Sequence, residues 1–181
     1  APRFKMLTTR ALTRSLPLGH WAMSLDLSDA YFHVPIHPSA QKYLRFAYEG
    51  VVYQFVALPF GISAAPWVFT RVASQVGRFL QRCLVPLPQY IDDWMTHADS
   101  PERALEFTDV VLRLTRGLGW RVNLDKSDLT PTQDFVFIGV HFNTALGIMK
   151  PPADRFYRAR ERIVSLLETR TATLCQWQSL L

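Results

Sequence analysis

The chain has 181 residues, of which 49% are hydrophobic, 13% aromatic and 19% charged, and its formal net charge is +5. This is too much apolar material for a disordered chain, and no stretch of about 20 uncharged apolar residues marks a membrane span. The two cysteines are far apart and match neither a disulfide framework nor a zinc site, so we expect an intracellular setting, the cytoplasm or the nucleus.

The first half of the chain predicts three strands followed by one long helix. The strands span residues 23–27, 43–48 and 51–57. A short turn at Glu49 and Gly50 joins the second strand to the third and predicts a hairpin. Apolar residues then recur at helical spacing over residues 64–83, which predicts a helix with one apolar face: Val68, Phe69, Val72, Val76, Phe79, Leu80 and Cys83.

The second half predicts strands that alternate with helices. The strands span residues 89–96, 121–124 and 135–142, and the helices span residues 100–118 and 154–168. Ser100, followed by a proline and an acid, caps the first of these helices, which places Leu105 and Leu118 on its predicted inner side. Because hairpins favour antiparallel pairing, the predicted fold class is α+β, an antiparallel β-sheet with helices packed on one face.

Charge is distributed unevenly along the chain. Residues 1–25 carry four basic residues and no acid, and residues 150–170 carry six bases against three acids. Residues 92–109 carry six acids and a single base. Basic ends and an acidic centre suit a polyanion held outside and a cation held inside. Ordinary surface charge scatter is the alternative that charge alone leaves open.

Three carboxylates lie in apolar strand contexts. Asp26 sits between two leucines, and Asp92 and Asp93 follow Tyr90 and Ile91. Buried carboxylates need a partner or a metal, and two adjacent ones repel each other. A tight hairpin with Asp92 and Asp93 at its tip, beside Asp26 on an adjacent strand, would form an all-oxygen site suited to Mg²⁺. A solvated surface turn for the pair, and a strand-end acid or helix cap for Asp26, are the simpler alternatives.

Five sequence motifs carry a family resemblance. They are SLDLSDAYFHVPI at residues 24–36, LPFGISAAPWVF at 58–69, YIDD at 90–93, LGWRVNLDK at 118–126 and FVFIGV at 135–140. In this order and spacing they resemble the palm of a reverse transcriptase, an RNA-directed DNA polymerase. The amino-acid sequences of these motifs look most like those of retrotransposon enzymes, particularly those of the DIRS-like elements that integrate with a tyrosine recombinase.

The resemblance implies a polymerase palm with partial fingers and the start of a thumb. Residues 1–22 would be the partial fingers, and residues 23–142 the palm, with a fingers insertion near residues 37–60. Residues 143–181 would begin the thumb, where the basic run at residues 155–162 would touch backbone phosphates. Three bases near the N-terminus are candidates by charge for binding the triphosphate: Arg3, Lys5 and Arg10.

The resemblance also implies the catalytic and metal-binding residues. Asp26, Asp92 and Asp93 match the family's metal-binding aspartates, which bind two Mg²⁺ ions, or Mn²⁺ in their place. The backbone carbonyl of Leu27 would add a ligand, and Lys126 matches a base that assists the leaving pyrophosphate. The implied partners are an RNA or DNA template, a DNA primer and deoxynucleoside triphosphates, with no membrane.

Two further groups of residues are implied to bind the substrates. The deoxynucleotide group consists of Asp29, Ala30, Tyr31, Phe60 and Gly61, and the primer grip consists of Ile138, Gly139 and Val140. A bulky ring at Tyr31 would exclude a ribose 2′-hydroxyl. Taken without the motifs, these residues would be a core tyrosine, a turn ahead of a helix and an ordinary hairpin.

Two alternatives to a polymerase stay open at the level of the sequence. The first is a catalytically inactive or truncated palm that acts as a nucleic-acid-binding module. The second is another palm-fold enzyme, such as an RNA-dependent RNA polymerase or a nucleotide cyclase. Tyr31 argues against ribonucleotide substrates, and the motif that begins at Leu58 is not expected in a cyclase.

Overall fold

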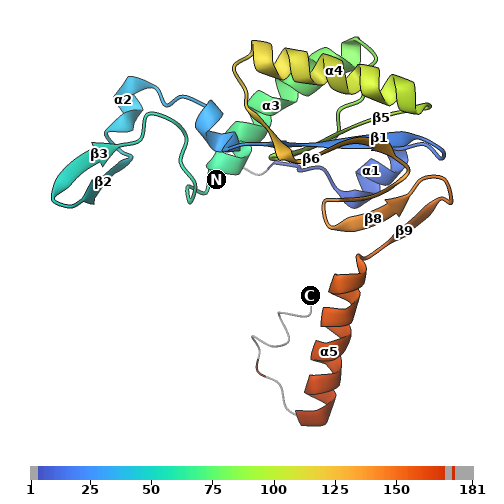
Figure 1. Cartoon of the computed structure of the whole chain (residues 1–181). Helices are drawn as coiled ribbons and strands as arrows, with labels where there is room; N and C mark the ends of the chain where they lie inside the picture. Colours follow the sequence, from blue (N-terminus) through green and yellow to red (C-terminus); the bar gives the residue numbers. More distant parts are fainter. Residues whose placement is uncertain (1–3, 170–172, 174–181) are drawn as a thin grey trace.

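The computed structural model describes residues 4–169 and residue 173, and its centre is a four-stranded sheet (Figure 1). In spatial order its strands are β4 (Gln89–Tyr90), β5 (Asp93–Ala98), β1 (Trp21–Leu27) and β6 (Val122–Thr132). Every neighbouring pair in this sheet runs antiparallel, as predicted.

Both faces of the central sheet are covered. One face carries the two long helices, α3 (Ala65–Arg82) and α4 (Pro101–Gly117) (Figure 1). The other face carries the short helix α1 (Thr9–Ser15) and a small antiparallel sheet. The strands of that sheet are β7 (Asp134–Phe137), β8 (Val140–Asn143) and β9 (Ile148–Lys150). The long helices therefore share one face, as predicted for this α+β fold.

Two parts of the chain project from this body (Figure 1). The first consists of η1 (Ala30–His33), α2 (Pro38–Gln41), β2 (Arg45–Tyr48) and β3 (Val51–Gln54). The second is α5 (Ala153–Thr169), which extends away from the sheets after β9. Within the described residues, no helix combines the length and apolar character needed to cross a membrane.

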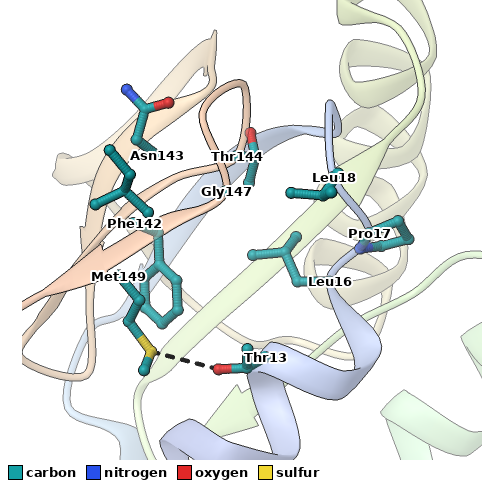
Figure 2. A pocket seen from close by; sticks show the side chains of 10 residues that line it. Thr13, Leu16, Pro17, Leu18, Phe142, Asn143, Thr144, Gly147 and Met149 are labelled. Carbon is teal, nitrogen blue, oxygen red and sulfur yellow. Dashed lines mark hydrogen bonds between the residues drawn. The ribbon is translucent and has the colours of Figure 1, made fainter.

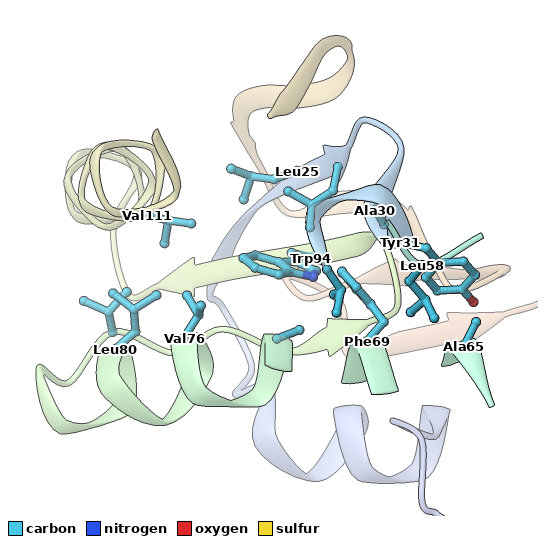
Figure 3. Packing of buried hydrophobic residues seen from close by; sticks show 14 residues of the cluster. Leu25, Ala30, Tyr31, Leu58, Ala65, Phe69, Val76, Leu80, Trp94 and Val111 are labelled. Carbon is cyan, nitrogen blue, oxygen red and sulfur yellow. The ribbon is translucent and has the colours of Figure 1, made fainter. Parts of the chain in front are cut away.

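The alternation of side chains along the strands builds two cores from one sheet. Leu25 of β1 and Trp94 of β5 point toward the long helices and pack with Phe69 and Leu80 of α3 (Figure 3). Met95, the next residue of β5, joins a cluster on the opposite face together with residues of α1, β7 and β8. The indole of Trp94 is fully buried and donates a hydrogen bond to the carbonyl of Ile91, 2.9 Å away.

Several predicted elements differ from the structure in their extent. The strand predicted at residues 121–124 runs from Val122 to Thr132, because register shifts against β1 let a partly exposed strand continue. The single strand predicted at residues 135–142 is two strands joined by a turn at Ile138 and Gly139. The strand predicted at residues 89–96 is the β4–β5 hairpin, as the hairpin predicted for the two aspartates requires, but its tip is Ile91 and Asp92 rather than Asp92 and Asp93.

The predicted inner faces of the long helices also differ in part from the structure. Val72, Phe79, Leu105 and Leu118 are exposed. The buried face of α3 is a narrow stripe that keeps three of the predicted apolar residues, Phe69, Val76 and Leu80. It adds two alanines, Ala65 and Ala73, because the helix packs closely on the sheet. The cap predicted for α4 is present, since the hydroxyl of Ser100 accepts a hydrogen bond from the N–H of Arg103 at 3.2 Å.

Candidate active site

The three aspartates singled out in the sequence come from two adjacent strands. Asp26 of β1 lies directly opposite Asp93 of β5 in the antiparallel register. Asp92 precedes Asp93, and its backbone carbonyl accepts a hydrogen bond from the N–H of Leu27 at 3.0 Å. Asp26, Leu27, Asp92 and Asp93 are therefore neighbours at one end of the central sheet.

The β4–β5 hairpin carries Asp92 on a strained tip. Tyr90 pairs with Asp93, so Ile91 and Asp92 form the two-residue connection. Ile91 has φ +54, a left-handed conformation that is costly for a β-branched residue. The hydrogen bond from the buried Trp94 indole to the Ile91 carbonyl holds this tip against the core.

Polar residues of β6 support Asp26 from the other side. The N–H of Asp26 donates to the Ser127 hydroxyl at 3.0 Å, and that hydroxyl donates to the carbonyl of Asn123 at 2.6 Å. Asn123 lies opposite Asp26 in the strand register. The sequence analysis did not identify Asn123 and Ser127; the only signal for them is their place beside Lys126 in the fourth motif.

The pKa values of the aspartates show that their charges act on one another. Burial raises the pKa of Asp26, the charge of Asp92 raises it further, and Lys126 opposes the shift. Burial likewise raises the pKa of Asp93, with added contributions from Asp92 and Asp26. Mutual repulsion of this kind is relieved by a cation placed among the carboxylates.

The donor chemistry fits a hard divalent cation, although the side chains do not yet surround one. Three carboxylates and a nearby backbone carbonyl are all-oxygen donors, the type preferred by Mg²⁺. In the described part of the chain, no three His, Cys, Asp or Glu side chains are grouped closely enough to hold a metal ion. The carboxylates nevertheless have the donor atoms that Mg²⁺ prefers and lie together at one end of the central sheet.

Tyr31 lies beside the aspartates and also belongs to the core. Its ring is 8% exposed, with centroids 4.9 Å from Phe60 and 5.6 Å from Phe69. Burial raises the pKa of Tyr31, and the charge of Asp92 adds to the shift, so the phenol is within electrostatic reach of the hairpin tip. Tyr31 is therefore a core residue that also lies where a substrate-binding residue is expected, so the two interpretations of Tyr31 do not exclude each other.

The other residues of the predicted nucleotide group lie around Tyr31. Asp29 and Gly61 both have left-handed backbones, with φ +52 and φ +86. Ala30 is buried next to Tyr31, whereas the ring of Phe60 is largely exposed. His33, at the end of η1, accepts a hydrogen bond from the N–H of Arg121 at 2.9 Å, which ties this segment to the start of β6.

The predicted primer-grip residues do not join the aspartates directly. Ile138 and Gly139 form the β7–β8 turn, and Val140 begins β8. Ile138 and Val140 pack on the cluster that contains Met95, two residues beyond Asp93 in β5. Of the basic candidates for the triphosphate, Arg3 lies outside the described residues.

A separate pocket lies away from these residues (Figure 2). It has a volume of about 230 Å³ and lies between α1 and the β8–β9 hairpin. Leu16, Leu18 and Phe142 contribute apolar walls, and the Thr13 hydroxyl donates to the sulfur of Met149 at 3.4 Å. None of its lining residues was predicted as a site residue. We therefore take the end of the central sheet that carries Asp26, Asp92 and Asp93 as the candidate active site.

Comparison with known proteins gives a family match and curated relatives. The model of the family described as reverse transcriptase (RNA-dependent DNA polymerase) matches residues 2–142. Protein P of duck hepatitis B virus (isolate white Shanghai duck S31) is 30% identical over 142 residues, covering 76% of this chain and 18% of the relative. The Gag-Pol polyprotein of walleye dermal sarcoma virus is 30% identical over 132 residues, covering 72% of this chain and 8% of the relative. The chain thus spans less than a fifth of these relatives' length.

Solved structures share the fold. The foamy viral protease-reverse transcriptase in complex with an RNA/DNA hybrid matches with a TM-score of 0.72 at 20% identity, covering 88% of this chain and 20% of that one. A second foamy viral structure, in complex with double-stranded DNA, matches with a TM-score of 0.81 at 18% identity, covering 99% of this chain and 29% of that one. At these identities the likeness concerns the fold.

Proposed function

Because this chain belongs to the reverse transcriptase (RNA-dependent DNA polymerase) family, we propose that it is the palm region of an RNA-directed DNA polymerase, a nucleotidyltransferase. The observation that carries the proposal is the convergence of Asp26, Asp92 and Asp93 at one end of the sheet, inside the family match. Residues 1–22 would be partial fingers, residues 23–142 the palm with its insertion near 37–60, and residues 143–181 the start of the thumb. The wording of the motifs favours a retrotransposon enzyme of the DIRS-like type.

The three aspartates would hold two Mg²⁺ ions, or Mn²⁺, with the carbonyl of Leu27 as a further ligand. When bound, such ions supply charge neutralisation at the reacting phosphate and a more acidic primer hydroxyl. The primer 3′-oxygen bonds to the α-phosphorus of the deoxynucleotide as the bond to pyrophosphate breaks. Lys126, whose charge already acts on Asp26, would stabilise or protonate the leaving pyrophosphate.

The residues around Tyr31 would select the nucleotide. Its ring is held between Phe60 and Phe69, so it cannot move aside to admit a 2′-hydroxyl without disturbing the core. The backbone of Asp29 and Ala30 would lie along the triphosphate, and the left-handed backbone at Gly61 would admit a close approach of the substrate.

The proposed nucleic-acid partner is a DNA primer on an RNA or DNA template. The foamy viral structures of the same fold hold an RNA/DNA hybrid and double-stranded DNA. The net charge of +5 favours a polyanionic partner for this chain as well. The turn at Ile138, Gly139 and Val140 would contact the primer strand.

Primer extension on an RNA template with deoxynucleotides and Mg²⁺ tests the proposal. We expect extension by the unsubstituted chain and a loss on the order of 100-fold or more in Asp92→Asn, which keeps the shape of the residue and removes its charge. Asp109→Asn is the matched control, because Asp109 is an exposed acid on α4 that pairs with Arg113, away from the three aspartates. Extension retained by Asp92→Asn would contradict the mechanism.

A nucleic-acid-binding module without catalysis is the second candidate function. It would need only the binding of a polyanion, which the net charge of +5 favours, and not the chemistry of the carboxylates. Salt-sensitive binding of the primer–template together with no extension, even with Mn²⁺, would support this candidate over the first.

A further inference from the structure

A second pocket lies between α3, the end of α1 and the segment that leads into β4. It has a volume of about 390 Å³ and shares no lining residue with the pocket in Figure 2. Leu7, Pro86, Leu87 and Pro88 give it apolar walls. Because a single water molecule occupies only about 30 Å³, the pocket has room for an organic molecule.

Two buried nitrogen atoms in the lining of this pocket have no hydrogen-bond partner among the described residues. They are Nε2 of Gln89 and Nε2 of His97, a residue that is 4% exposed. The other ring nitrogen of His97, Nδ1, lies 3.0 Å from Nδ1 of His20. When His20 donates the proton of this contact, His97 carries its own proton on Nε2. Both unpartnered groups are then N–H donors, and a buried donor without an acceptor is unfavourable.

The position of the Gln89 side chain depends on a glycine in α3. A Cβ atom placed on Gly77 would lie 2.6 Å from Oε1 of Gln89 and 3.3 Å from its Cδ. Gly77 lies inside the helix and has no positive φ, so its backbone does not require glycine, and glycine is unfavourable within a helix. The missing side chain of Gly77 therefore provides the space in which the Gln89 amide rests against α3.

The only formal charge in the described lining at neutral pH is positive. Arg78 lines the pocket from α3 and is exposed. No Asp or Glu is among the described lining residues, and none of the ion pairs in residues 4–169 involves Arg78. A ligand with negatively charged oxygens would therefore accept hydrogen bonds from the two donors and pair with the guanidinium.

We propose that this pocket binds a small organic anion, an apolar body that carries one carboxylate or phosphate group. The anionic group accepts from Gln89 and His97 and pairs with Arg78, and the apolar body packs against the walls. The inference goes beyond the proposed function and does not depend on it. The pocket contains none of the three aspartates and no residue of the predicted nucleotide group or primer grip.

Binding of three aromatic probes to the ¹⁵N-labelled full chain, followed by the chemical shifts of its backbone amides, tests the proposal. Benzoate and phenyl phosphate are the carboxylate and phosphate probes, and benzamide is a neutral probe of similar shape. We expect both anions to shift the amides of Gly77, Gln89 and His97 with a Kd of about 1 mM, within the range for ligands of so few atoms. Benzamide should bind at least about tenfold more weakly, because it has no charge to pair with Arg78. The tighter of the two anions identifies the preferred anionic group.

Substitutions in the lining locate the anionic group. Arg78→Gln should weaken benzoate binding by about tenfold and Gln89→Leu by about fivefold. Gly77→Ala should weaken it as Gln89→Leu does, although it leaves every donor in the chain, because the new methyl group displaces the amide. The double variant of Gly77→Ala and Gln89→Leu should bind no more weakly than Gln89→Leu alone, since both changes remove the same donor. Arg71→Gln is the charge-matched control, because Arg71 is an exposed residue of α3 that does not line the pocket.

Three results would overturn the proposal. The first is no shift of these amides with either anion at about ten times the expected Kd, which would leave water as the occupant. The second is benzamide binding as tight as that of benzoate, and the third is an equal effect of Arg78→Gln and Arg71→Gln. None of these readouts uses primer extension, so a failure of the proposed polymerase function and a failure of this inference are distinguishable.

Discussion

At the scale of single residues, the aspartates of the candidate active site destabilise the folded chain. Burial and mutual charge raise the pKa values of Asp26 and Asp93, which means that their ionised forms are less stable in the folded chain than in water. The charge of Asp92 contributes to both shifts. A site of this kind exchanges stability for the ability to attract a cation.

We therefore expect Asp92→Asn to raise the melting temperature when divalent cations are absent. Each kcal/mol recovered would appear as about 2–4 °C in a chain of this size. Added Mg²⁺ should stabilise the unsubstituted chain more than the variant, because it binds the folded state with all three carboxylates. Differential scanning fluorimetry with and without Mg²⁺ measures both effects, with Asp109→Asn as the control. A lower melting temperature for Asp92→Asn than for the control would show that repulsion does not dominate here.

Tyr31 combines a packing role with a proposed selective one, and two substitutions separate them. Tyr31→Phe keeps the ring between Phe60 and Phe69 and should preserve the preference for deoxynucleotides. Tyr31→Val removes the ring, so we expect ribonucleotide use to rise by about tenfold relative to deoxynucleotides. The same change should cost about 2–4 kcal/mol of stability through the cavity it leaves. Competitive incorporation assays on both variants measure the selectivity, and unchanged discrimination in Tyr31→Val would remove the steric role.

At the scale of elements, the sequence predicts best where local signals and packing agree. The helix that begins after Ser100 and the hairpin around Glu49 and Gly50 carry their own cap and turn residues, and both are present. The α1 helix has only one buried side chain, Leu12, and takes its stability from the second hydrophobic cluster, so periodicity cannot reveal it.

Hydrophobic periodicity alone does not locate a turn inside an uninterrupted apolar run, and only the family motif pointed to a hairpin at Ile138 and Gly139. The β7–β8 turn falls inside the run of residues 135–142, because Ile138 packs on the core although it sits in the turn. The sequence predicts a hairpin with Asp92 and Asp93 at its tip, because neighbouring residues of a strand point to opposite faces and can meet at one site only at a turn. For the active site, the sequence identifies the carboxylates but misses the hydrogen bond from Asp26 to Ser127, since a bulged register cannot be read from strand spacing.

Ser100, the N-cap residue of α4, allows a direct test of how much one local sequence signal contributes to the free energy of unfolding. Ser100→Ala removes the acceptor for the Arg103 N–H and should lower the free energy of unfolding by about 1 kcal/mol, with the denaturant slope unchanged. Ser100→Asp keeps an acceptor at the cap and should retain the stability. Urea titrations of the three chains measure the difference. A loss in Ser100→Asp as large as in Ser100→Ala would mean that the hydroxyl acts through some other contact.

At the scale of the whole molecule, β5 joins the site to both cores. Trp94 anchors the sheet to the long helices, and Met95 anchors it to α1 and the β7–β8 hairpin. Asp93 comes directly before Trp94 and Met95 in β5. The end of the sheet that carries the aspartates is therefore held by packing on both faces, although the long helices and the β7–β8 hairpin lie on opposite faces. The proposed primer turn and the aspartates are therefore connected through one strand rather than through direct contact.

The far end of β5 makes the stability of the whole chain depend on pH. His97 is 4% exposed, and its Nδ1 lies 3.0 Å from Nδ1 of His20. Burial, and then the charge of His20, lower the pKa of His97 from 6.5 to about 4. Between these two values the unfolded chain binds a proton at His97 that the folded chain does not, so the contribution of His97 to the free energy of unfolding falls as the pH falls. The contribution is fully present above pH 6.5 and is lost progressively toward pH 4, for a total of about 3 kcal/mol.

Urea unfolding of the full chain at half-unit steps from pH 7.5 to pH 4 measures this slope. We expect His97→Gln to lose the part of the slope that His97 contributes, because the substituted side chain does not titrate, and His37→Gln, at an exposed position in the projecting segment, to keep it. The raised pKa values of Asp26 and Asp93 act in the opposite direction and are common to all three chains, so the difference between the slopes isolates His97. The exposed acids Asp134 and Asp154 have lowered pKa values, so their contributions are lost only below pH 4, outside this window. An unchanged slope in His97→Gln would mean that His97 is protonated in the folded chain near its ordinary pKa, and the contact between His97 and His20 would then not limit stability in mild acid.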